Sequence, residues 1–306
     1  MKHITLLLLI MLFFSACNSE SINEDPEEQA CDGGTFTGII TLSTQTEVDD
    51  FGANCYTKID GSLSLIDLDT TDDKIVDLTP LQNLTEVFTS DPTSSWATLR
   101  INTSLLTDLQ GLNNLERVGR LLIQYNESLL TLNGLNSLTS IGTTNEVTLN
   151  ELKITSNPQL QTLEGLDNLE IVGFGNSLTK LDIQGNGALL HLDHLNGLVE
   201  FNSSEPISGQ GLSGNIWIFG NPLISHVNGL SNLSDIHGGN ISFLFASDLV
   251  GSDICDIYVA NDNLTNYCGL QNLFTNGNYG NFTSGNGNCG IFEVSIQDII
   301  DGNCSE

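Results

Sequence analysis

The stretch LKITSNPQLQTLEGLDNLEIVG, Leu152 to Gly173, decides the fold of this chain. It begins with two apolar residues around one polar residue, Leu152-Lys-Ile154, an alternation that is typical of a short β-strand. From Leu160 to Val172 the apolar residues recur at every third position. On an α-helix each step of three residues turns about 300°, so such a stripe would drift around the helix. The spacing therefore predicts short extended or 3₁₀ segments that turn corners, with one side chain inward at each edge.

Imperfect copies of this stretch lie before and after it. Their common core is Leu-x-Gly-Leu-x-Asn-Leu, which gives about seven coils at a period of roughly 23 to 40 residues, as in repeat proteins. The clearest copies begin at Leu109, Leu132, Leu163 and Val227, and looser ones span 78 to 84, 192 to 198 and 267 to 273. Because one coil cannot bury its own apolar side, the coils must stack, with the strands of successive coils paired in parallel. We therefore predict a mainly β fold, a leucine-rich-repeat-like parallel β-helix solenoid, over residues 61 to 273.

The charge balance excludes some classes of partner. The chain has 306 residues with 8 Lys+Arg against 38 Asp+Glu, a formal net charge of −30. Such a charge repels phosphate backbones and anionic lipid surfaces, so we expect no nucleic-acid partner and membrane attachment only through an anchor.

The first residues have the pattern of a targeting segment. A polar start is followed by an apolar run from Ile4 to Phe14, which is too short to span a bilayer, so residues 1 to 16 are expected to be a signal peptide. The small residues before Cys17 resemble a bacterial lipoprotein lipobox, with Phe14 where Leu is usual. This resemblance implies cleavage before Cys17 and a diacylglycerol on its sulfur; the alternative is a secretory signal with a chance cysteine. Residues 17 to 30 are acidic and lack aromatics, as expected of a disordered tether.

Six cysteines remain after Cys17, and an even number in an exported chain predicts disulfides. They are Cys31, Cys55, Cys255, Cys268, Cys289 and Cys304. Two precede the central coils and four follow them, where the open ends of a solenoid core need closing. Cys31 with Cys55 is the expected first pair, and the other four leave three pairings open. Zinc is the alternative for the last four, but no tight Cys-x-x-Cys spacing occurs, and we predict no metal.

Both ends of the solenoid are expected to carry caps. Residues 31 to 60 contain a strand-like segment from Thr35 to Leu42 and a capping box at Thr44-Gln-Thr-Glu47, which predicts a short helix ending at Gly52. Residues 274 to 306 form the second cap, with a short helix from Ser295 to Ile300.

The first cap and the coils after it resemble the receptor L-domain family. The resemblance rests on Leu42-Ser-Thr-Gln-Thr-Glu-Val, on Phe51-Gly-Ala-Asn-Cys55 and on the coils, and it covers residues 31 to 273. It implies β-helix-like coils with a ligand-binding habit, as in lobes of growth-factor receptors and in surface lipoproteins of Bacteroidetes-type bacteria. An outer-membrane, cell-surface location follows from this resemblance. Receptor signalling does not, because nothing in these residues matches the receptors' cysteine-rich modules or kinase.

One strand differs from the others on its outward face. In Ile216-Trp217-Ile218-Phe219 the alternation points the isoleucines inward and both aromatics outward. The strand expected over 257 to 259 places Tyr258 outward in the same way, whereas earlier coils carry polar residues there, as a solvated face does: Arg100, Gln124, Lys153 and Asp182. Exposed aromatics suit stacking on sugar rings or anchoring a protein. Trp217, Phe219 and Tyr258 are therefore candidate ligand-binding residues; the alternative is that the segment after Asn240 folds over them as core.

No arrangement typical of a nucleophilic or phosphate-transfer enzyme is legible. Polysaccharide-cleaving β-helices need clustered carboxylates beside Arg or Lys, but here the basic residues from Arg100 to Lys180 belong to separate coils. We therefore expect a protein or glycan to be bound without catalysis, without catalytic residues and without a cofactor. The alternatives are a carbohydrate-active β-helix enzyme and a structural envelope spacer.

Three further groups have a structural interpretation. Asparagines that follow successive strands are expected to form a structural ladder: Asn126, Asn157, Asn186 and Asn221. His191, His194 and His226 are expected to stack at the surface, with a three-imidazole metal site as the alternative. The acidic turn from Asp67 to Asp73 is interpreted as a solvated loop, with a weak calcium site as the alternative.

Overall fold

The computed structural model of this chain describes residues 33–67, 72–89, 97–143, 149–174, 178–201, 216–237, 239–243, 261, 263–284 and 294–305. They belong to one compact unit that begins at Asp32. The predicted signal peptide, Cys17 and the tether lie outside these residues, as do Cys31, Cys255, Tyr258 and Cys289. Within the described ranges, no helix has the length and apolar character needed to cross a membrane.

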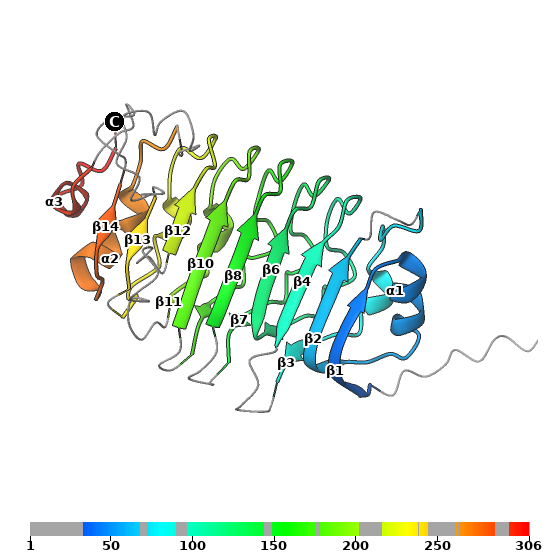
Figure 1. Cartoon of the computed structure of the whole chain (residues 1–306). Helices are drawn as coiled ribbons and strands as arrows, with labels where there is room; N and C mark the ends of the chain where they lie inside the picture. Colours follow the sequence, from blue (N-terminus) through cyan, green and yellow to red (C-terminus); the bar gives the residue numbers. More distant parts are fainter. Residues whose placement is uncertain are drawn as a thin grey trace, which may run out of the picture. The chain divides into compact units, whose positions relative to one another are not determined.

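Short strands pair in parallel along this unit and form two ladders (Figure 1). The first ladder contains β1 (Thr35–Leu42), β2 (Lys58–Ile66), β4 (Thr98–Asn102), β6 (Arg120–Gln124), β8 (Leu149–Thr155), β10 (Leu178–Gln184), β12 (Ile216–Phe219), β13 (Ile241–Ser242) and β14 (Phe282–Thr283). The second contains β3 (Glu86–Phe88), β5 (Arg117–Val118), β7 (Ser140–Ile141), β9 (Ile171–Val172) and β11 (Glu200–Phe201). Each strand pairs with its counterpart one repeat later. The predicted mainly β stack of coils with parallel strands is therefore confirmed.

Strand β2 joins the two ladders. Its first residues, Lys58 to Asp60, pair with β3, and its last, Leu63 to Ile66, pair with β4. Gly61 lies between these parts with φ +148°, and a Cβ there would stand 1.8 Å from the carbonyl oxygen of Gly38 on β1. Only glycine permits this backbone and this approach.

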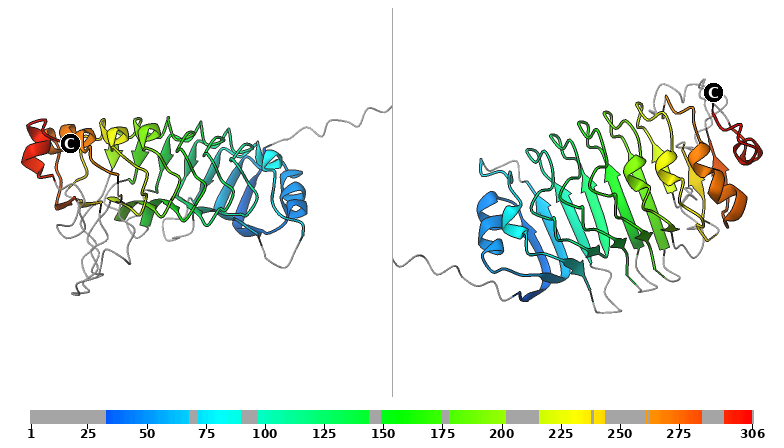
Figure 2. Two further views of the ribbon diagram at one scale, coloured as in Figure 1. Left: turned by 90° about the horizontal axis from the view of Figure 1, so that it is seen from above. Right: turned by 180° about the vertical axis from the view of Figure 1, so that it is seen from behind.

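The corners between the ladders are tight turns, as the three-residue spacing predicts. Among the described residues, 3₁₀ helices form the turns at η1 (Thr79–Leu81), η2 (Asp193–Leu195), η3 (Asn228–Leu230) and η5 (Cys268–Leu270). In the quoted stretch, Leu166 N donates to Leu163 O at 3.1 Å and Leu169 N to Leu166 O at 3.0 Å. Its inward residues from Leu160 to Val172 are all fully buried. Figure 2 shows the turns on the side of the coils behind the strands of the first ladder.

The glycine of the repeated core lies directly on the previous coil. Gly165 has φ +114°, and a Cβ there would come within 2.1 Å of Leu132 O. The same approach to the preceding coil's backbone recurs at Gly111, Gly134, Gly229 and Gly269. The repeated glycine therefore sets the close stacking of the coils.

Helices close the ends of the unit. Helix α1 (Gln45–Gly52) begins as predicted, with Glu47 N donating to Thr44 Oγ1 at 3.1 Å, and its Val48 and Phe51 are buried. Helix α3 (Ile296–Ile300) has the capping box of Ser295. Both predicted helices are confirmed.

Helix α2 (Gln271–Asn276) was not predicted. It follows η5 directly and spans the boundary at residue 273 that we placed between coils and cap. Leu270, Leu273 and Phe274 are all buried, so the spacing between buried residues is first three positions and then one. This spacing keeps the apolar residues on one face of a helix.

A disulfide among the described residues joins the last coil to the second cap. Cys268 and Cys304 are bonded with their Cα atoms 5.0 Å apart, which ties η5 to the chain beyond α3. Tyr267 N also donates to Cys304 O at 2.8 Å. Cys55 is disulfide-bonded as well. Its predicted pairing with Cys31 involves a residue outside the described ranges and stays a prediction. Cys255 and Cys289 also lie outside these ranges.

Candidate functional site

A ladder of buried asparagines fixes the corner at which the strands of the first ladder end. Asn157 Oδ1 accepts from the backbone N–H and the side-chain amide of Asn126, at 3.1 and 2.8 Å. Asn157 Nδ2 donates to Ile123 O and to Asn186 Oδ1, both at 3.1 Å. The pattern continues through Asn221 to Asn261, and all five side chains are buried. The predicted structural ladder is confirmed.

The left-handed backbone of this corner belongs to the residue before each asparagine. The positive φ angles, 58° to 67°, lie at Tyr125, Ser156, Gly185 and Gly220. The residue with this left-handed backbone does not need a buried hydrogen-bond partner for its side chain. The type of residue at this position therefore differs from coil to coil. Tyr125 is 61% exposed, while the next three corners carry small residues. This difference hollows the surface beside Tyr125.

A groove of about 460 Å³ occupies that hollow. Tyr125 lies at the β6 end of its lining, and Phe219 and Pro222 lie at the β12 end. Side chains of Gln124, Thr155 and Gln184 and the small corner residues line it between these ends. Gln124 Nε2 donates to Thr155 Oγ1 at 3.0 Å. The lining thus combines two aromatic rings with planar amides and hydroxyls, the groups that bind a polar ring-shaped ligand.

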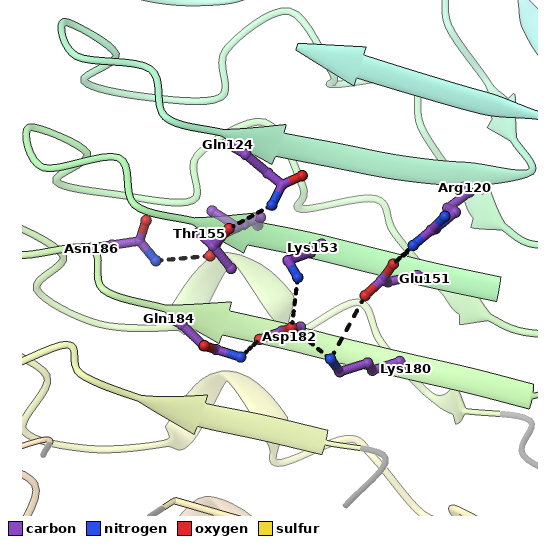
Figure 3. A network of polar contacts seen from close by, with 10 residues as sticks. Arg120, Gln124, Glu151, Lys153, Thr155, Lys180, Asp182, Gln184 and Asn186 are labelled. Carbon is purple, nitrogen blue, oxygen red and sulfur yellow. Dashed lines mark hydrogen bonds and ion pairs between the residues drawn. The ribbon is translucent and has the colours of Figure 1, made fainter. Parts of the chain in front are cut away.

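A network of charged side chains lies on the same face, next to the groove (Figure 3). Arg120 on β6 contacts Glu151 on β8 through two nitrogens, with Nε at 2.8 Å from Oε2. Lys180 on β10 lies 2.8 Å from Asp182 Oδ2 and 3.9 Å from Glu151 Oε1. Lys153 on β8 lies 3.4 Å from Asp182 Oδ2 and also lines the groove. Gln184 donates to the other oxygen of Asp182.

This network corrects two sequence-based expectations. We took the outward face to be solvated, yet the side chains of Asp182 and Glu151 are only 0% and 2% exposed. We also counted the basic residues as dispersed because they belong to separate coils. Parallel register makes them neighbours: Glu151 pairs with Lys180 across β8 and β10, although 29 positions separate them. The sequence does contain a signal for this proximity, which we missed: these charged residues occupy equivalent positions in successive repeats.

The predicted aromatic residues of β12 face outward, as alternation requires. Ile216 and Ile218 are fully buried, whereas Trp217 and Phe219 are half-buried. The Lys180 Nζ stands 3.7 Å from the centre of the Trp217 ring, a cation–π contact. Trp217 therefore belongs to the charged network, and Phe219 belongs to the groove.

The strand next to β12 is β13, which pairs Trp217 with Ser242. It lies at the start of the segment after Asn240. The place that we assigned to Tyr258 beside Trp217 is thus held by Ser242, and Tyr258 itself lies outside the described residues.

The three histidines stack as expected. The rings of His191 and His226 lie 6.2 Å apart at an interplanar angle of 10°, and His194 lies 5.8 Å from His191. Carboxylates that we did not anticipate accompany them. Asp193 lies 3.6 Å from His191 Nδ1 and 3.5 Å from His226 Nδ1, and Asp167 lies 2.7 Å from His194 Nδ1. Burial alone would raise the pKa of Asp167, but its hydrogen bonds and the charge of His194 hold it below its ordinary value.

No metal centre is built from the described side chains: nowhere in these ranges do three or more His, Cys, Asp or Glu stand where they could hold an ion. At the acidic turn, Asp67 accepts from Ser104 N and Oγ at 2.8 and 2.7 Å and from Ile75 N at 3.0 Å. Asp73 accepts from Thr46 N at 3.2 Å. Asp67 thus ties its coil to the next one, and Asp73 ties it to helix α1. Residues 68 to 71 lie outside the described ranges.

A second, smaller groove of about 360 Å³ lies over β5, β7 and β9. Arg117, Glu170 and Phe174 line it. The Arg117 guanidinium stacks 3.7 Å over the Phe88 ring, which holds it in place at the edge of this groove.

Comparison with protein-family models and with curated proteins found no match for this chain.

Proposed function

We propose that this chain is a non-catalytic binding protein of the cell surface, whose groove between Tyr125 and Phe219 takes a glycan. The observation that carries the proposal is the composition of that groove: aromatic rings at both ends, with amides and hydroxyls between them. Aromatic faces pack against the C–H faces of sugar rings, and planar amides satisfy hydroxyl pairs. A protein segment is the other ligand class that such a surface suits.

The architecture supports the same proposal. The chain resembles receptor L domains, in which stacked leucine-rich coils form ligand-binding lobes, and the stacked parallel coils agree with that resemblance at the level of architecture. The groove crosses four strands from β6 to β12, each from a successive coil. With neighbouring strands about 4.8 Å apart, three intervals span roughly 14 Å, enough for a short oligosaccharide.

The binding test uses substitutions that the chain itself supplies. Tyr125→Ser copies the corner residue Ser156, which has the same φ of 58°, and Phe219→Gln copies Gln184, its partner in register. The double variant should therefore keep the fold. On a glycan array and in calorimetric titration, we expect it to bind at least tenfold more weakly than the parent, a loss of about 1.4 kcal/mol or more.

The matched control is the double variant Leu105→Ala, Leu190→Ala. Both leucines are exposed apolar residues that do not line the groove. Control and parent should bind alike. Equal weakening in both double variants, or undiminished binding without Tyr125 and Phe219, would contradict a groove-centred site. A hit list made only of proteins would assign the groove to a protein segment.

The charged network favours a second candidate, a carbohydrate-active enzyme. Glu151 and Asp182 are two buried carboxylates on one face with Lys180 between them, the kind of grouping that acid–base cleavage of glycans uses. Each carboxylate is already held by cations of the network, which favours binding over proton transfer. Release of reducing sugars from mixed polysaccharides would decide for the enzyme. Absence of both turnover and binding would leave a structural spacer.

We further propose that Cys17 carries the lipid that holds this protein at the outer membrane, on the resemblance of residues 14 to 17 to a lipobox. Mass spectrometry of the mature protein from its host should show an acylated N-terminal Cys17. Cys17→Ser should release the protein from the membrane fraction, because a chain of charge −30 is not held by anionic lipid. Retention of residues 1 to 16 in the mature protein would contradict this assignment.

A further inference from the structure

Basic side chains gather on the face that carries the groove. Four of the chain's eight lysines and arginines lie on the outward side of β4, β6, β8 and β10: Arg100, Arg120, Lys153 and Lys180. In a chain of net charge −30 this face therefore holds a local concentration of positively charged side chains.

The charged network holds one cation more than it has carboxylates. Arg120, Lys153 and Lys180 contribute three positive charges, and Glu151 and Asp182 contribute two negative ones. The buried pairs therefore use two cations, and one positive charge remains for a ligand.

The geometry identifies Lys153 as the surplus cation. Arg120 holds Glu151 through two nitrogens, and Lys180 holds Asp182 at 2.8 Å. Lys153 stands farther from Asp182, at 3.4 Å, and its side chain is 27% exposed against 12% for Lys180. Of the three cations it alone lines the groove. It can therefore turn toward a bound anion while Asp182 keeps its closer partner.

We infer that the ligand is an acidic glycan, a short linear oligosaccharide of uronic acids, whose carboxylate pairs with Lys153. This inference rests on the proposed function and specifies the chemistry of its ligand. The sugar rings lie along the groove between Tyr125 and Phe219, and Gln124 and Gln184 bond to hydroxyls. The single ammonium of Lys153 pairs with one carboxylate of the bound segment, while the planar amides bond to hydroxyls of the neighbouring sugars.

The test compares one ligand with and without its charge. Oligogalacturonate and its fully methyl-esterified form have the same rings and length, and only the first carries carboxylates. The parent should bind the acid form at least tenfold more tightly than the ester. Lys153→Gln should bring this ratio close to one, and Lys153→Arg, which keeps a cation at that place, should restore most of it. Oligomannuronate and its ester serve as a second pair in case the groove discriminates between sugar epimers.

The control is Lys58→Gln, which removes the same charge from the chain at a lysine outside the groove that pairs with Glu86 at 3.2 Å. It should leave the acid-to-ester ratio unchanged. A ratio near one in the parent, or a ratio that survives Lys153→Gln, overturns the inference. If neutral glycans bind and Tyr125→Ser with Phe219→Gln abolishes that binding, the proposed function stands while the acidic ligand fails. If no glycan binds in any form, both fail together.

Discussion

Replacing Asn157 with alanine should lower the free energy of unfolding by about 3 to 6 kcal/mol. The side chain of Asn157 is fully buried and bonds four groups: the Asn126 N–H, the Asn126 side-chain amide, the carbonyl of Ile123 and Asn186 Oδ1. None of them can reach water once the amide is gone. Each buried polar group left without a partner costs about 1 to 3 kcal/mol. Urea unfolding followed by circular dichroism measures the loss.

Asn168→Ala is the matched control for this substitution. Asn168 Nδ2 also bonds the preceding coil, donating to Asn136 O at 2.7 Å, but this asparagine is exposed. Water replaces the lost bond, so we expect a cost below about 1 kcal/mol. Equal costs for the two substitutions would show that the ladder is not what holds the corner in place.

Lys180→Met should lower the free energy of unfolding by about 3 to 5 kcal/mol, because it removes the nearest cation, at 2.8 Å, from the fully buried Asp182 and leaves it only the longer contact with Lys153 at 3.4 Å. Lys180 is the cation shared by Glu151 and Asp182, and methionine keeps the apolar stem beside Trp217. The cost should be visible as a lower urea midpoint with an unchanged slope.

Lys58→Met provides the comparison. Lys58 also pairs with a carboxylate on the next strand, Glu86 at 3.2 Å, but its side chain is 50% exposed. Exposed ion pairs contribute about 0 to 1 kcal/mol, so this variant should unfold almost like the parent. A Lys180→Met variant as stable as Lys58→Met would mean that Asp182 and Glu151 do not depend on their shared lysine.

The coil was predictable because each of its features repeats. Three features recur once per coil: the three-residue spacing seen from Leu160 to Val172, the corner asparagine and the glycine equivalent to Gly165. A single coil that departs from the pattern therefore does not change the predicted fold. The capping residues Thr44 and Ser295 were legible for a different reason, since helix starts depend on only a few adjacent residues.

The charged network and the groove were not predictable in the same way. Alternation shows that Asp182 points away from the core, but its burial depends on Lys180 on the same strand and on Lys153 and Trp217 on the two neighbouring strands. Lys153 and Trp217 lie close to Asp182 because of the register between strands, and this register cannot be derived from the sequence of a single coil. The groove depends on a contrast of size between Tyr125 and the corners after it, and that contrast appears only when the coils are superimposed.

The sequence-based predictions failed mainly after β12, where the repeat becomes irregular. After β12 the spacing of copies lengthens, and β13 supplies the next strand earlier in the chain than the alternating segment at 257 to 259 suggested. Helix α2 replaces the last turn because Leu273 and Phe274 are adjacent apolar residues in a region where period three has ended. The end of the three-residue apolar spacing therefore indicates where the cap begins.

The most direct test of the central claim is a crystal structure of the mature protein bound to an acidic oligosaccharide at saturating concentration. We expect sugar rings across β6 to β12, between Tyr125 and Phe219, with a carboxylate within hydrogen-bonding distance of Lys153 Nζ. An oligosaccharide bound instead at the groove beside Arg117, or an empty groove between Tyr125 and Phe219 under those conditions, would contradict it.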